Sequence, residues 1–69
     1  MSLRLTVSHD RPMPAELERG VSRIAAMSSP TLEAIRRELD GYAIEDERAI
    51  EMISRAMRVA SSAVSEALS

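Results

Sequence analysis

The stretch from Ala43 to Ser69, AIEDERAIEMISRAMRVASSAVSEALS, places the strongest constraint on how this chain can fold. It contains no proline or glycine, and its acidic start at Glu45–Glu47 suits the first turn of a helix. The spacing of its apolar residues predicts one long C-terminal helix. The apolar face covers about half of the helix circumference, which is wider than the roughly 100° stripe of an ordinary surface helix.

This wide face consists of two adjoining rows of apolar residues. The first row has alternating spacings of three and four and contains Ile50, Ile53, Met57, Ala60, Val64 and Ala67. The second row lies beside it and contains Ala49, Met52, Ala56, Val59 and Ala63. One row can pack against the rest of the same chain. We expect the second row to contact another chain, because the shorter helices before it can cover only one of the two rows. The small residues of this face would permit a close approach of helices.

Two shorter helices are predicted before this stretch. The first runs from about residue 14 to 27, since Pro14 suits the first turn of a helix. Gly20 costs about 1 kcal/mol relative to alanine inside a helix, and we interpret it as a point of close helix approach. The second helix follows Ser29 as N-cap and Pro30 as first residue. It ends near Gly41, which can adopt a positive φ.

The predicted fold is therefore all-α: a helical hairpin of two or three helices with a long C-terminal helix, oligomerising. We expect an extended N-terminal arm over residues 1–13 and a helical hairpin domain over residues 14–69. The candidate core consists of the inward apolar positions of the three helices, namely Leu17, Val21, Ile24, Leu32, Ile35, Leu39, Ile50, Ile53, Met57, Ala60 and Val64.

The size of the chain also points to a partner. It has 69 residues and no cysteine. A chain this short buries only about 60% of its unfolded surface, so small folds commonly add disulfides, a metal or another subunit. The absence of cysteine excludes disulfides and thiolate metal sites. We therefore expect a homo-oligomer, at least a dimer, or a complex with a helical protein partner.

Composition argues against several classes of function. A single histidine, His9, gives no metal site, no serine has an adjacent base, and two glycines provide no phosphate loop. We therefore expect no enzyme activity, cofactor or small-molecule substrate. A net charge of −2 argues against a nucleic-acid partner. No apolar run of about 18 residues or secretory signal occurs, which predicts no membrane span and a cytoplasmic protein, unless a specialised route exports it.

The N-terminal half resembles the ribbon-helix-helix repressors. The alternating segment RLTVS precedes an amphipathic helix and then SSPTLEAIRREL. The resemblance implies an intertwined dimer in which outward strand residues enter the major groove of DNA. Those DNA-binding residues would be Arg4, Thr6 and Ser8.

The C-terminal part is similar to type III secretion needle and inner-rod subunits. Residues 29–32 (SPTL), residues 38–42 (ELDGY) and the uninterrupted helix to Ser69 carry this resemblance, together with the ending AVSEALS. It implies a subunit that packs its helices against several neighbours in a helical tube. The sequence thus favours a non-enzymatic assembly protein of this kind. The alternatives are a ribbon-helix-helix repressor or antitoxin, and a small helical adaptor or chaperone.

Overall fold

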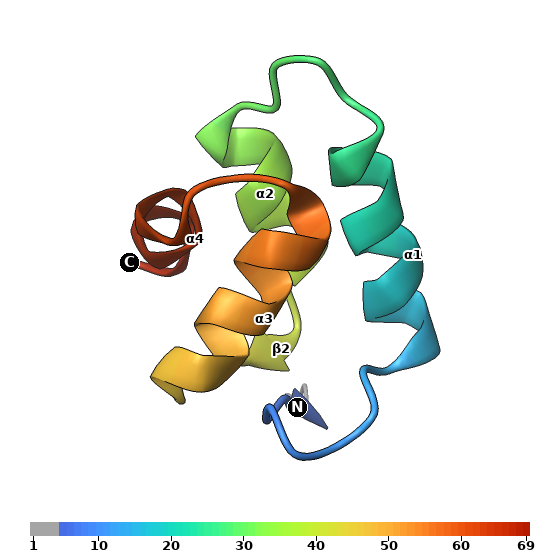
Figure 1. Ribbon diagram of the computed structural model, residues 1–69, viewed down its shortest axis with the longest axis vertical. Helices are drawn as coiled ribbons and strands as arrows, with labels where there is room; N and C mark the ends of the chain where they lie inside the picture. The colour runs from blue at the N-terminus through green and yellow to red at the C-terminus, as the bar shows by residue number, and fades with distance from the viewer. Residues whose placement is uncertain (1–4) are drawn as a thin grey trace.

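The computed structural model describes residues 5–69, which form four helices and a small sheet (Figure 1). In chain order these are β1 (Leu5–Thr6), α1 (Ala15–Ala25), α2 (Leu32–Leu39), β2 (Tyr42–Ala43), α3 (Glu47–Met57) and α4 (Ser61–Leu68). The predicted helical class is confirmed. The radius of gyration is 10.9 Å, close to the roughly 11 Å expected for a folded chain of this length.

The stretch predicted as one long C-terminal helix is two helices, because the chain turns at Arg58. Arg58 has a left-handed backbone with φ of 62°. Its N–H donates to the Arg55 carbonyl at 3.2 Å, and the Val59 N–H donates to the Ser54 carbonyl at 3.0 Å. These two bonds form a Schellman motif, which ends a helix. The chain then folds back, and α4 packs against both α2 and α3, seen nearly end-on in Figure 1.

The predicted close approach at Gly20 is confirmed. Gly20 is buried in α1, and a Cβ atom there would lie 2.6 Å from Oε1 and 3.3 Å from Cβ of Glu38 in α2. One turn further along α1, Arg23 donates two hydrogen bonds to the Glu38 carboxylate, at 2.8 and 3.1 Å. The hydrogen bond from Arg23 lowers the pKa of Glu38, against the opposing effect of burial. Gly20 thus makes room for an ion pair that joins α1 to α2.

Side chains of two N-cap residues fix where α2 and α3 begin. Thr31 Oγ1 accepts a hydrogen bond from the Ala34 N–H at 3.1 Å. The cap of α2 is therefore Thr31 and not Ser29, and the predicted start moves two residues along the chain. Asp46 Oδ1 accepts a bond from the Arg48 N–H at 3.0 Å and caps α3. The break between these helices at Asp40–Gly41 is confirmed, with φ of 90° at Gly41.

One hydrophobic core lies between the four helices and the sheet. Eight of the predicted core residues are buried in it: Leu17, Val21, Ile24, Ile35, Leu39, Ile53, Met57 and Val64. The sequence analysis missed Val7, Ile44 and Ala49, and Ala67 is buried as its row implied.

Three predicted core positions need correction. Leu32 is 40% exposed, because it is the first residue of α2 and lies at the rim of the helix packing. Ala60 is exposed because it lies in the turn between α3 and α4. Ile50 is only half-buried and packs against the edge of the core.

The N-terminal arm is part of the domain from residue 5 onward. β1 pairs with β2 in parallel, with Leu5 opposite Tyr42 and Thr6 opposite Ala43. The Val7 N–H donates to the Ala43 carbonyl at 2.9 Å, and the Val7 side chain is 3% exposed. Of the separate arm predicted for residues 1–13, the part from residue 5 onward is thus anchored by a strand and a core residue.

Candidate functional site

The predicted partner face, the second apolar row, is divided by the fold. Ala49 is completely buried inside the domain and cannot contact a partner, which corrects its assignment to that face. Val59 and Ala63 are half-buried and pack against the core. Met52 is half-buried and also packs against the core, whereas Ala56 is exposed. The turn at Arg58 separates Val59 and Ala63 from the other three residues, because α4 does not extend the face of α3.

Met52 and Ala56 belong to a groove along α3, which we call the α3 groove. Its volume is about 410 Å³, and it is lined by His9, Arg48, Glu51, Met52, Arg55 and Ala56. Met52 and Ala56 are four residues apart and therefore neighbours on one face of the helix. The structure thus joins two residues of the predicted partner face with charged residues of the same helix and with His9 from the N-terminal arm.

His9 is held beside the groove by Asp46. The two side chains meet with 2.5 Å between His9 Nδ1 and Asp46 Oδ2. The hydrogen bond from His9, followed by that from the Arg48 N–H, lowers the pKa of the Asp46 carboxyl. From the sequence, His9 was considered as a metal ligand, and this contact was not predicted. Asp46 lies 37 residues away in the chain, so no local spacing indicated it.

The arginines of the α3 groove have no ion-pair partner in the part of the chain that the structure describes. Between residues 5 and 69, Arg23 pairs with Glu38, and Asp46 lies in contact with the imidazole of His9. Arg48 and Arg55 are exposed on α3. Since they are seven residues apart, about 10.5 Å along the axis, both project on the same side of the helix. Their charges are available to groups outside the chain.

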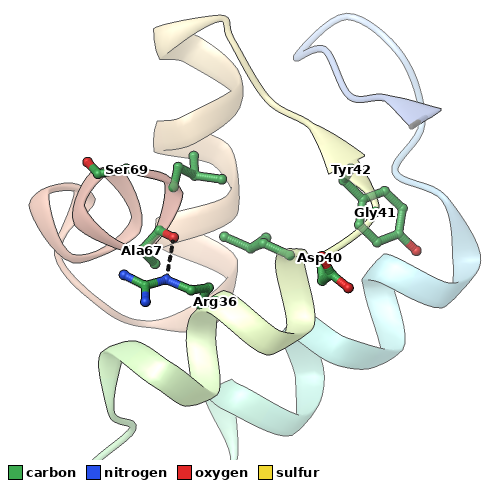
Figure 2. A pocket seen from close by; sticks show the side chains of 8 residues that line it. Arg36, Asp40, Gly41, Tyr42, Ala67 and Ser69 are labelled. Carbon is green, nitrogen blue, oxygen red and sulfur yellow. Dashed lines mark hydrogen bonds between the residues drawn. The ribbon is translucent and has the colours of Figure 1, made fainter. Parts of the chain in front are cut away.

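A second cavity lies between the C-terminal ends of α2 and α4, beside β2 (Figure 2). Its volume is about 230 Å³, and its lining includes Arg36, Asp40, Tyr42 and Ser69. Arg36 Nε donates a hydrogen bond to the Ala67 carbonyl at 3.1 Å, drawn as a dashed line in Figure 2. A cation beside the last carbonyls of a helix is favoured by the helix dipole. This arginine therefore fastens α4 to α2.

The structure describes two of the three residues that the resemblance to repressors implies for DNA contact. Arg4 lies outside the described residues. Thr6 is exposed on β1 and Ser8 is half-buried after it. One edge of β1 is occupied by β2 of the same chain, whereas the ribbon of a repressor is formed between two chains.

Residues 5–69 contain neither a metal-binding cluster nor a membrane-spanning helix. No group of three or more histidine, aspartate or glutamate side chains could hold a metal ion there. None of the helices there has the length and apolar content to cross a bilayer. Comparison with family models, curated proteins and solved structures found no match for the chain.

Proposed function

We propose that this protein is a non-enzymatic interaction domain that binds a helical protein partner through the α3 groove. The observation that carries the proposal is the position of Met52 and Ala56. Both line the α3 groove: Ala56 is exposed there, and Met52 packs against the core with one part while the other part stays open to the groove. The flanking Arg48 and Arg55 have no ion-pair partner among residues 5–69. An apolar strip bordered by charged residues is the surface that helix-in-groove recognition requires.

The fold of α4 favours a protein with one discrete binding surface over a subunit that packs against several neighbours. The sequence resemblance to secretion needle subunits used, besides its short motifs, an uninterrupted helix from Ala43 to Ser69. In the structure that stretch turns at Arg58, and α4 packs on α2 and α3 of its own chain. The apolar surface left for a partner is correspondingly smaller, which suits a small adaptor. We expect moderate affinity, as in interfaces below about 1,200 Å².

Site-specific photo-crosslinking in cells tests the proposal without knowledge of the partner. A photoreactive amino acid at Ala56 should trap a protein adduct of higher mass. Ser62 is a matched control, because it is also exposed on a helix but lies outside the α3 groove. The same group at Ser62 should give no adduct, or much less. Absence of an adduct from both Ala56 and Met52 would disprove the proposed function.

A further inference from the structure

We infer that the partner segment is an acidic amphipathic helix, which places apolar side chains on Met52 and Ala56 and carboxylates on Arg48 and Arg55. This inference rests on the proposed function and specifies the chemistry of its partner. Three features of the described residues support it: the charge of the α3 groove, the spacing of its arginines and the size of its apolar residues.

The charge of the groove differs in sign from that of the chain. Two arginines and one glutamate line it, which gives +1 with His9 neutral. The whole chain carries −2, so the remaining residues together carry −3. An acidic ligand is therefore repelled by most of the molecule and attracted to this face. Electrostatic complementarity of this kind selects the partner and speeds the encounter more than it raises affinity.

The spacing of the arginines matches a docked helix. Arg48 and Arg55 are separated by seven residues, or about 10.5 Å along α3. Two carboxylates two turns apart on a helix lying along the groove have the same separation. Arginine suits this role because its guanidinium can donate two parallel hydrogen bonds to one carboxylate.

The apolar strip fits the side chains of such a helix. Ala56 is small and lets a neighbouring helix approach closely, whereas the flexible thioether of Met52 adapts to differently shaped apolar groups. Apolar residues at successive helical turns of the ligand would anchor there, as in other helix-in-groove complexes.

A second copy of this chain fits the groove less well. A two-fold symmetric pair brings the same surface patch of each copy together. Two α3 grooves facing each other would oppose arginines: Arg55 to Arg55 if the helices are parallel, and Arg48 to Arg55 if they are antiparallel. Like charges opposed across an interface are unfavourable. The charge distribution therefore favours a different, acidic chain.

Two peptides of opposite charge test the inference on the full-length protein. The acidic probe is a terminally blocked, alanine-rich helical peptide of roughly 15 residues, with leucines along one face and two glutamates two turns apart beside them. The matched basic probe has lysines in place of those glutamates. By fluorescence anisotropy we expect the acidic probe to bind at least tenfold more tightly. This preference should shrink as salt is raised, since added ions screen exposed charges.

Charge reversal in the groove provides the decisive variant. The double substitution Arg48→Glu and Arg55→Glu should reverse the preference, so that the lysine probe binds more tightly. The control is Arg19→Glu with Arg37→Glu, which changes the net charge equally but lies in another pocket, on α1 and α2. It should keep the preference for the acidic probe. Circular dichroism should show both variants folded.

The inference fails if the wild-type protein binds both probes equally or neither, or if both double variants behave alike. These results leave the proposed function intact as long as Ala56 still crosslinks to a protein. An Ala56 adduct of twice the chain's mass would identify a second copy as the occupant and would also overturn the acidic-helix assignment.

Discussion

Arg36 of α2 donates a hydrogen bond from Nε to the carbonyl of Ala67, near the last turn of α4, with 3.1 Å between the two atoms (Figure 2). The two residues are 31 positions apart, and their contact crosses between the helices that flank the second cavity. It explains how the short helix α4, with only eight residues, keeps a fixed position against α2. Isolated helices of this length are not stable in water, so contacts of this kind and core packing must hold it.

Loss of the Arg36 donor should therefore destabilise the domain. The substitution Arg36→Met keeps the aliphatic part of the side chain but removes the hydrogen bond to Ala67. We expect a loss of about 1 kcal/mol in the free energy of unfolding, the usual net value of such a bond. Urea denaturation measures it. Arg37→Met is the control, because Arg37 is exposed on the same helix and makes no hydrogen bond to α4. Equal effects of the two substitutions would contradict a specific role for Arg36.

Substitution by glycine should change the stability of the domain in opposite directions at Arg58, which has a left-handed backbone, and at Arg55, which is helical. Glycine adopts a positive φ without the steric cost that arginine bears, so Arg58→Gly should stabilise the domain by about 0.5–1 kcal/mol. Arg55→Gly, inside α3, should destabilise it by about 1 kcal/mol because glycine is a poor helix residue. Thermal unfolding of both variants provides the comparison. A stability loss at both positions would mean that α3 continues through residue 58.

The Arg23–Glu38 pair predicts how stability changes in acid. The pKa of Glu38 is lower in the folded chain than in the unfolded chain, where it is about 4.3. Its contribution to stability is therefore fully present above about pH 4.3 and is lost as pH falls through the lower, folded pKa. Glu38→Gln removes this contribution. The urea midpoints of variant and wild type should differ at pH 6 and converge toward pH 2.5.

Screening by solvent limits how much the Arg23–Glu38 pair contributes to stability. The Arg23 side chain is 62% exposed and that of Glu38 is 19% exposed, so we expect no more than about 1 kcal/mol at pH 6. Other carboxylates in the chain titrate in both proteins and do not affect the difference between them. A difference that stays constant from pH 6 to pH 2.5 would show that Glu38 acts by packing and not by its charge.

The parts of the fold that the sequence predicted correctly depend on local patterns. The apolar spacing of Leu17, Val21 and Ile24 identified the buried face of α1, and Gly20 indicated the close contact with α2. The parts that were missed depend on contacts between distant segments. Pairing of β1 with β2, burial of Val7 and the His9–Asp46 contact all join residues more than thirty positions apart.

The break between α3 and α4 was missed for a different reason. Glycine is the usual residue at a Schellman turn, and the segment RVASS contains none. Arg58 occupies the left-handed position instead, at a cost that the packing of α4 on α2 and α3 offsets. Because the break was not recognised, Ala60 was assigned to the core although it lies in the turn. The sequence pointed to the α3 groove only through Met52 and Ala56, which it assigned to a partner face. It did not place His9 there, because His9 reaches the groove from the N-terminal arm.

Ala60 offers a direct test of this corrected position. In the structure it is the N-cap of α4, with an extended backbone (φ −69°, ψ 146°) and no side-chain hydrogen bond to the helix. Aspartate at an N-cap accepts a hydrogen bond from an N–H group of the first turn, and capping residues are worth about 1 kcal/mol relative to alanine. Ala60→Asp should therefore raise the free energy of unfolding by about that amount, measured by urea denaturation.

The neutral variant Ala60→Asn separates capping from charge, since asparagine caps about as well as aspartate. It should give most of the same gain. Had Ala60 been inside the core, as its place in the first apolar row predicted, aspartate would be buried without a partner and the domain would lose several kcal/mol. The sign of the change therefore distinguishes the two folds. A stabilised Ala60→Asp protein would show that a new helix begins after residue 60, as the turn at Arg58 and the return of α4 onto α2 and α3 require.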